Sequence, residues 1–322
     1  MHELFSIANN TETNISPLVG SIGWRSNIDE LGDQLDFDIA FNDDRYFPLN
    51  PVDVGNLIIL RNTDEIFRGV VVTENRSGRG AIGYTTFDYG FYLNKSKEIY
   101  QFNGVRADQA ILKILGDFNI PVGLVMDIKT VVTKIYPSGT VSDIIKDILK
   151  MAEDETGIKY RMEFRQGKFY IEKQQDIIIK LKFQLASNLA PDDVTSAISN
   201  PSRKRSIEDM RNSIKLVSND AVVAAVRDES LIKQYGLLQE VSSVDEKDLA
   251  QAGNIANTML KDLGRVFEET SLDMPGDDTA RAGRLIEIQE PVTGMSGLYL
   301  IKNVAHTVKK GIHAMSLGLG VP

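Results

Sequence analysis

Cysteine is absent from the 322 residues of the chain, and only one tryptophan and three histidines are present. Without cysteine there is no disulfide framework, no thiolate nucleophile and no cysteine-bound metal. The chain also has no apolar run close to the roughly 20 residues that a membrane-spanning helix requires. The start, Met1-His2-Glu3, lacks the basic and apolar segments of a secretory signal. We therefore expect no membrane span and no Sec-type export, while the composition leaves the compartment open.

Basic residues are also fewer than acidic ones. The chain has 36 Lys and Arg against 45 Asp and Glu, which gives a formal net charge of -9. Proteins that bind nucleic acid by neutralising phosphates present a basic face, so we expect no sequence-specific nucleic-acid partner. Hydrophobic residues make up 42% of the chain, which is enough for packed cores. The length suggests two or three domains.

Residues 1–96 are a series of short strand patterns separated by turns rich in Asn, Asp, Gly and Pro. Within 36–41, Phe37, Ile39 and Phe41 alternate with polar positions, so they are expected to face a core. The strands are expected over 4–7, 15–24, 35–41, 57–60, 67–72 and 81–87. This run of strands, with almost no helical period, predicts a first tube-like β-barrel domain. Trp24 is expected to be a core residue or an interface anchor.

Residues 97–187 change to a helical period and predict an inserted helix-plus-hairpin α/β domain. The expected elements are helices over 107–118 and 140–157, a hairpin over 160–171 and a strand over 177–185. Thr140 with Asp143 makes a weak capping box, and Gly157 ends the second helix. Residues 188–206 are polar and contain Pro191, Pro201 and a basic run, so they predict a linker.

Residues 207–322 predict a second tube-like β-barrel domain with a long helix. Its expected elements are strands over 214–217, 222–226, 266–274, 285–288, 298–308 and 312–319, a short helix capped by Ser230 and a long helix from Asp245 to Gly264. Lys310-Gly311 reads as a two-residue hairpin loop. This loop would pair Val308 with His313, His306 with Met315 and Val304 with Leu317, with Thr307, Ala314, Ser316 and Gly318 on the other face.

Two histidines on one hairpin raise the possibility of a metal site. In the predicted register His306 and His313 are diagonal neighbours about 7–8 Å apart at Cα, whereas zinc requires three or four converging ligands. The remaining histidine, His2, lies at the far end of the sequence. We therefore expect structural histidines and no metal.

The carboxylates and the glycine-rich loops do not form a catalytic motif. Asp36 and Asp38 share one strand face, but only Ala40 accompanies them, which is too little to form the apolar setting of a general acid. The loops 77–80 and 294–297 fail as phosphate-binding and dinucleotide-binding motifs, because a strand follows each. We expect no catalytic residue and no cofactor.

Several segments together carry a family resemblance. The strongest are "FNGVRADQAILKILGDFNIPVG" and "GTVSDIIKDILKMAEDETGIKYRMEFRQGKFYIEK"; others are "DFDIAF", "PVDVGNLIILRN", "IFRGVVV", "RSIEDMRNSIKLVSND", "DESLIKQYGLLQEVSSVD" and "GLYLIKNVAHTVKKGIHAMSLGL". In this order they resemble baseplate hub proteins of contractile phage tails, the late-control-protein-D and PBSX-type hub group. The resemblance covers nearly the whole chain. The loop 275–282 fits no pattern.

The resemblance implies a structural hub without an active site, in a phage tail or an R-type, phage-tail-like bacteriocin. It implies a homotrimer whose two barrels per chain adapt a hexameric tail tube to a central spike. The expected partners are the tail tube protein, the central spike protein, other baseplate proteins and the tape measure protein. Assembly is expected in the bacterial cytoplasm, and the final location is the virion tail or the extracellular bacteriocin particle.

Two alternatives of other classes remain, a tail-associated cell-wall hydrolase and an all-β carbohydrate-binding module. Against the first, the sequence has no HExxH and no Gly-x-Ser-x-Gly motif. Against the second, most Tyr and Phe residues alternate toward a core, whereas a sugar-binding sheet would expose them on one face.

Overall fold

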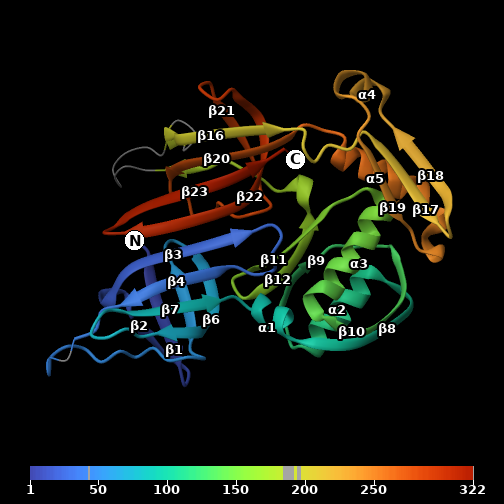
Figure 1. The fold of residues 1–322 in the computed structure, drawn as a ribbon. Helices are drawn as coiled ribbons and strands as arrows, with labels where there is room; N and C mark the ends of the chain where they lie inside the picture. Colours follow the sequence, from blue (N-terminus) through green and yellow to red (C-terminus); the bar gives the residue numbers. More distant parts are fainter. Residues whose placement is uncertain (43, 184–191, 194–196, 322) are drawn as a thin grey trace.

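The computed structural model describes residues 1–42, 44–183, 192–193 and 197–321 (Figure 1). Strands make up 49% of the chain and helices 21%, which confirms the prediction of a mainly β protein of the α+β class. No closed barrel is found among the described residues. The strands from both ends of the chain instead belong to one open 13-stranded sheet. No helix in the described ranges is long and apolar enough to cross a membrane.

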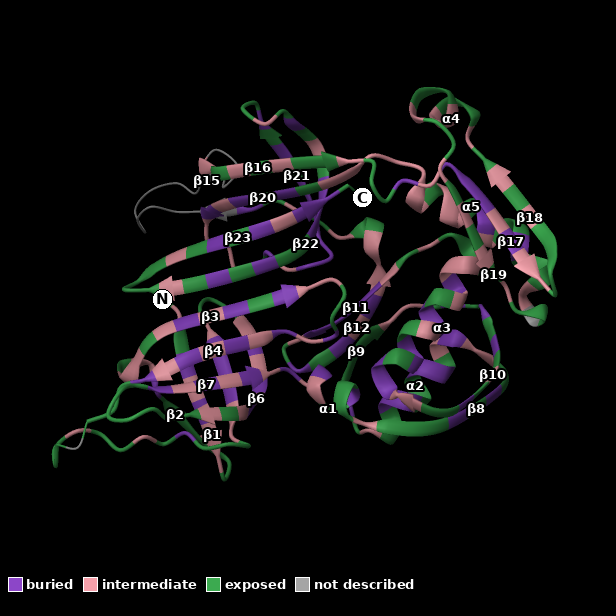
Figure 2. Ribbon diagram, in the orientation of Figure 1, coloured by how far each residue is buried: buried purple, intermediate pink, exposed green. Residues whose placement is uncertain are grey.

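Seven strands from residues 1–87 form one part of this sheet, called the first β lobe below. They are β1 (Glu3–Ala8), β2 (Thr11–Asn14), β3 (Val19–Asn27), β4 (Gln34–Ile39), β5 (Leu57–Arg61), β6 (Glu65–Asn75) and β7 (Ile82–Phe87). Their order is β3-β4-β7-β6-β5-β1-β2. Figure 2 shows buried and less buried residues alternating along β3, β4 and β7, as a sheet with one core face requires. Trp24 is buried in this core.

Two details of the first β lobe differ from the prediction. β3 begins at Val19 rather than at residue 15, because Ser16–Leu18 form a 3₁₀ helix around Pro17, and proline has no N–H for a strand ladder. β4 ends at Ile39, so Phe41 lies in the following loop and is 36% exposed instead of facing the core.

The inserted unit, residues 90–173, has its own core. It contains α1 (Gly90–Lys95), β8 (Lys97–Arg106), α2 (Ala107–Asp117), β9 (Val122–Val125), β10 (Val131–Thr140), α3 (Val141–Thr156), β11 (Tyr160–Arg165) and β12 (Lys168–Lys173). The apolar stripes of α2 and α3 are buried against β8 and β10. Gly157 ends α3 at φ +70°, as predicted. Thr140 is the N-cap of α3, but its side chain makes no capping hydrogen bond, so the predicted capping box is wrong.

The second β lobe comes from segments on both sides of residue 210. Its strands are β13 (Ile178–Ile179), β16 (Ser199–Ser206), β20 (Phe267–Pro275), β21 (Leu285–Glu290), β22 (Met295–Lys309) and β23 (Ile312–Gly320). β16 pairs with β20 where the sequence indicated a linker. The strand expected over 177–185 is represented by the short pieces β13 and β14 (Lys182–Phe183), the latter paired with β15 (Asp192–Asp193). Residues 184–191 and 194–196 of the predicted strand and linker lie outside the described residues.

Residues 213–263 form a separate α/β unit rather than part of a barrel. It contains β17 (Ser213–Ser218), β18 (Ala221–Arg227), α4 (Glu229–Tyr235), β19 (Gln239–Ser243) and α5 (Ala252–Leu263), with the sheet order β18-β17-β19. α4 is capped by Asp228, whose side chain accepts from the N–H groups of Ser230 and Leu231, so the predicted Ser230 cap is wrong. Residues 246–251, expected within the long helix, are a 3₁₀ helix that precedes α5.

The two β lobes meet edge to edge, where β3 pairs antiparallel with β22 from Asn27↔Asn303 to Ser21↔Lys309. Figure 1 shows these blue and red strands side by side. The β22–β23 hairpin has the predicted register, with Lys309 opposite Ile312, His306 opposite Met315 and Val304 opposite Leu317. Its loop residues Lys310 and Gly311 both have positive φ, as a type I′ turn requires.

Candidate functional site

The candidate carboxylates Asp36 and Asp38 lie on the outer face of β4, on a shallow cavity of about 420 Å³. Asp36 accepts hydrogen bonds from Gln34 and from the Thr85 hydroxyl at 2.7 Å. Asp38 accepts from the Ser21 amide at 2.9 Å and hydroxyl at 2.5 Å. Each carboxylate is therefore held by polar groups of its own sheet, which is not the apolar environment of a general acid.

The glycine-rich loops take the roles of turns between strands. Residues 77–80 connect β6 to β7, and residues 291–294 with the first residues of β22 turn the chain back from β21. No helix N-terminus follows either loop, so neither offers the row of free N–H groups that holds a phosphate.

A more concentrated group of polar side chains lies where the two β lobes meet. His306 stacks on Trp24 with ring centroids 4.5 Å apart and an interplanar angle of 6°. His306 Nδ1 lies 3.1 Å from His313 Nε2, and His306 Nε2 lies 2.9 Å from the Ala280 carbonyl oxygen. Burial lowers the pKa of His306 to about 3 and that of His313 to about 4. Both imidazoles are therefore neutral near pH 7.

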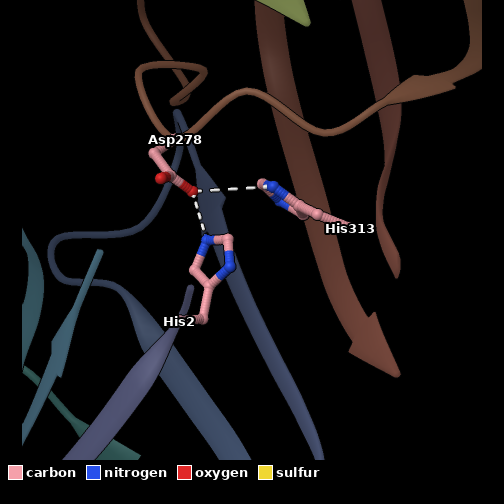
Figure 3. A group of neighbouring side chains, drawn as sticks. All are labelled: His2, Asp278 and His313. Carbon is pink, nitrogen blue, oxygen red and sulfur yellow. Dashed lines mark hydrogen bonds and ion pairs between the residues drawn. The ribbon is translucent and has the colours of Figure 1, made fainter. Parts of the chain in front are cut away.

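His2 belongs to the same group, although the sequence placed it far from the other two histidines. Its Nε2 lies 2.7 Å from Asp278 Oδ1, and His313 Nδ1 lies 3.6 Å from the same oxygen (Figure 3). One ligand-type atom from each of the three side chains lies within 4.8 Å of the others. The N-terminus is held nearby, because the Met1 ammonium donates to Asn62 Oδ1 at 2.8 Å.

Residues 276–284, between β20 and β21, bring these groups together and are called the junction loop below. Toward the first β lobe, Asp278 contacts His2 and Asn62, Arg281 contacts Asp33, and Ala282 contacts Ser26. Toward the β22–β23 hairpin, Asp278 contacts His313 and Ala280 contacts His306. Toward the inserted unit, Arg281 contacts Phe164 and Arg284 contacts Glu163. The junction loop thus contacts the first β lobe, the β22–β23 hairpin and β11 of the inserted unit. It largely coincides with the segment 275–282 that matched no pattern in the sequence.

The basic end of the junction loop is buried in an ion network. Arg284 pairs with Glu163 through two hydrogen bonds, one of them 2.7 Å long, and both side chains are at most 6% exposed. Burial alone would raise the pKa of Glu163, but Arg281 and Arg284 outweigh it and lower the pKa to about 2. Sequence reasoning missed Glu163, Asp278, Arg281 and Arg284. The only signal was the change from acidic to basic residues within the loop.

The comparisons with known proteins agree with this architecture. The family model described as YQBQ-like matches residues 22–320. The chain belongs to the YQBQ-like family. The phage-like element PBSX protein XkdQ of Bacillus subtilis is 25% identical over 259 residues, which cover 79% of this chain and 77% of XkdQ.

Two solved tail proteins have the same fold as this YQBQ-like chain. The prophage MuSo2 43 kDa tail protein from Shewanella oneidensis aligns with a TM-score of 0.74 at 13% identity, covering 98% of this chain and 97% of that one. A tail protein from Neisseria meningitidis MC58 aligns with a TM-score of 0.71 at 12% identity, covering 99% and 96%. The expected relation to phage tail proteins is thereby confirmed at the level of family and fold.

Proposed function

We propose that this chain is a structural baseplate hub that forms a trimeric ring between a hexameric tail tube and a central spike. The observation that carries the proposal is the β3–β22 pairing, which joins two β lobes edge to edge within one chain. The kinship with PBSX XkdQ and the fold shared with prophage tail proteins support a place in a tail. The particle is a phage tail or an R-type bacteriocin, assembled in the bacterial cytoplasm.

The symmetry of such a ring follows from the number of lobes. The first β lobe supplies seven strands of the 13-stranded sheet and the second supplies six. Three copies around an axis would present six lobes of similar size, which suits a six-fold tube on one side and a three-fold spike on the other. Because main-chain hydrogen bonds join the lobes, their relative orientation does not depend on a flexible linker.

A contact surface for a second copy is available on the loop between β4 and β5. In this loop Tyr46 is 86% exposed and Leu49 is 92% exposed. Large apolar and aromatic side chains of this kind are enriched at protein interfaces and often supply much of their binding energy. We assign these two side chains to the subunit contact of the ring.

The trimer can be tested by measuring mass in solution. The chain would be expressed alone and together with candidate spike and tail tube proteins, and each sample analysed by native mass spectrometry and sedimentation. We expect three copies of the chain per complex with the spike, and one to three copies for the isolated chain, because a partner that binds only the ring stabilises it by mass action. A chain that stays monomeric in every mixture would contradict the hub proposal.

A second assay separates the hub from the hydrolase alternative. We expect the purified chain to release no soluble fragments from bacterial cell wall, because Asp36 and Asp38 are held by polar neighbours. Release that disappears in Asp36→Asn or Asp38→Asn, while Glu12→Asn leaves it unchanged, would show an enzyme instead.

A further inference from the structure

We propose that His2, Asp278 and His313 form a binding site for one divalent first-row transition metal ion of the zinc type. From the sequence we expected no metal, because two histidines are fewer than the three or four ligands that zinc requires. The structure supplies the missing ligands from the N-terminus and from the junction loop. This proposal does not depend on the hub role.

The hydrogen bonds of His306 set the protonation of His313. A carbonyl oxygen can only accept, so His306 Nε2, 2.9 Å from the Ala280 oxygen, carries the proton. The Nδ1 of the neutral ring is then an acceptor, and His313 Nε2, 3.1 Å away, must donate to it. The lone pair of His313 is thereby left on Nδ1, which faces Asp278 Oδ1 at 3.6 Å.

Two electron-rich atoms therefore face each other at a place that a cation would favour. Asp278 is held as an acceptor at both oxygens, because His2 Nε2 lies 2.7 Å from Oδ1 and Asn62 Nδ2 donates to Oδ2 at 2.9 Å. Neutral imidazoles and a carboxylate are the ligands that zinc prefers. When zinc binds, the proton that His2 Nε2 donates to Asp278 is released or moves to Nδ1, so that the Nε2 lone pair faces the ion. Zinc bound at about 2.1 Å to each ligand separates neighbouring ligand atoms by roughly 3.4 Å. The observed 2.7 and 3.6 Å bracket that value.

The surroundings also resemble those of metal ligands. Histidine ligands usually donate their second ring N–H to another group, which fixes the tautomer, and His313 does so to His306. Asn62 Nδ2 donates to the second oxygen of Asp278 at 2.9 Å. A cavity of about 780 Å³, lined by Asp278 and His313 among others, reaches the site from solvent, so water can fill a remaining coordination position. His2, Asp278 and His313 are each 25% exposed or less at the side chain.

A bound ion would connect parts of the protein that are distant in sequence. His2 precedes β1, Asp278 belongs to the junction loop, and His313 lies on β23. The ion would tie the N-terminus of the first β lobe to the hairpin of the second and would stabilise the folded chain by binding it in preference to the unfolded one.

The test is metal binding by the whole chain without a polyhistidine tag. After removal of metal with a chelator, zinc would be titrated by calorimetry and counted by elemental analysis, and cobalt would be added to record its visible absorption. We expect one zinc per chain, a higher melting temperature with zinc, and no response to magnesium or calcium, because those ions prefer oxygen ligands. Absence of saturable zinc binding would overturn the proposal.

Variants distinguish this site from general attraction of cations to an acidic surface. His2→Ala, Asp278→Asn and His313→Ala should each weaken zinc binding by at least about 100-fold, and His306→Gln by about 10–100-fold through loss of the supporting hydrogen bond. Asp64→Asn removes an exposed carboxylate from the same cavity, outside the junction loop, and should bind zinc as the unchanged chain does. His2→Ala alters the chain end, so it keeps the test valid if His313→Ala fails to fold. Equal zinc affinity of His2→Ala, Asp278→Asn and the unchanged chain would refute the site.

Discussion

At the scale of single residues, the protein has one buried and one exposed Glu–Arg ion pair of similar geometry. Glu163 and Arg284 are 4% and 6% exposed at the side chain, whereas Glu12 and Arg61 are 40% and 34% exposed. Each pair has two hydrogen bonds. The two pairs differ strongly in burial, and Glu163 also lies 3.0 Å from a second cation, Arg165.

Glu163→Gln should destabilise the protein far more than Glu12→Gln. Removing one partner of a buried pair leaves an uncompensated charge, at a cost of about 3–5 kcal/mol, while an exposed pair contributes about 0–1 kcal/mol. The measurement is the free energy of unfolding from denaturant titration of both variants. Similar losses in the two would mean that the Arg284 side chain is hydrated in solution.

The same carboxyl predicts a pH dependence of stability. Its folded pKa of about 2 lies below the ordinary value of 4.5, so the unfolded chain binds the proton more readily between these values. The contribution of Glu163 to stability is therefore complete above pH 4.5 and is lost as the pH falls toward 2. The difference in unfolding free energy between the unchanged chain and Glu163→Gln should shrink over this window. A difference that stays constant with pH would contradict the assignment.

At the scale of elements, the β22–β23 hairpin offers a matched pair of substitutions. Leu317 is 1% exposed in the core of the second β lobe, and Thr307 lies on the exposed outer face. Leu317→Lys buries an unpaired charge and should cost several kcal/mol. Thr307→Lys places the same side chain in water near Asp36 and Asp38 and should change stability by less than about 0.5 kcal/mol.

Thermal and chemical unfolding of both variants checks this prediction. Unchanged stability of Leu317→Lys would mean that the face of β23 is assigned wrongly. A folded Thr307→Lys protein that no longer assembles into particles would show that the outer face is covered by a neighbouring subunit or protein.

Local features of the chain were predictable, and contacts between distant segments were not. The hairpin register followed from Lys310-Gly311 and from alternation over a few residues. The β3–β22 pairing, from Asn27↔Asn303 to Ser21↔Lys309, joins residues at opposite ends of the chain and has no local pattern. Helix starts were partly mistaken, because Asp228 and Ser230 are both good caps and only the backbone geometry decides between them.

The same reasoning applies to the candidate metal site. Its ligands come from three separate segments, and sequence spacing alone does not indicate that His2 returns to the β22–β23 hairpin. The contacts of the junction loop could likewise not be predicted from the sequence. Its Arg281 pairs with Asp33, just before β4, and its Arg284 pairs with Glu163 on β11. Ion pairs between segments so distant in the sequence depend on the strand pairing that brings the two segments together.

At the scale of the whole molecule, two α/β units are set between strands of one large sheet. The inserted unit follows the first β lobe, and residues 213–263 interrupt the second between β16 and β20. The junction loop connects the first β lobe, the hairpin and the inserted unit through polar contacts. Because one loop joins these parts, we expect them to move as a single body when subunits assemble.

The β4–β5 loop projects from this body (Figure 1) and carries the proposed subunit contact. Tyr46 and Leu49 are almost fully exposed there, so replacing both with serine should leave the free energy of unfolding nearly unchanged. If they anchor a neighbouring copy, the double variant should lose about 2 kcal/mol or more of association free energy. This loss corresponds to a dissociation constant that is roughly thirtyfold larger.

The measurement is sedimentation of the chain with the proposed spike partner over a range of concentrations. Val292→Ser serves as the control, because it removes a similarly exposed apolar side chain, 85% exposed, from the turn between β21 and β22. We expect the control to assemble as the unchanged chain does. If the double variant assembles equally well, or if Val292→Ser weakens assembly to the same extent, the contact lies elsewhere, because loss of exposed apolar surface at this loop would then have no specific effect.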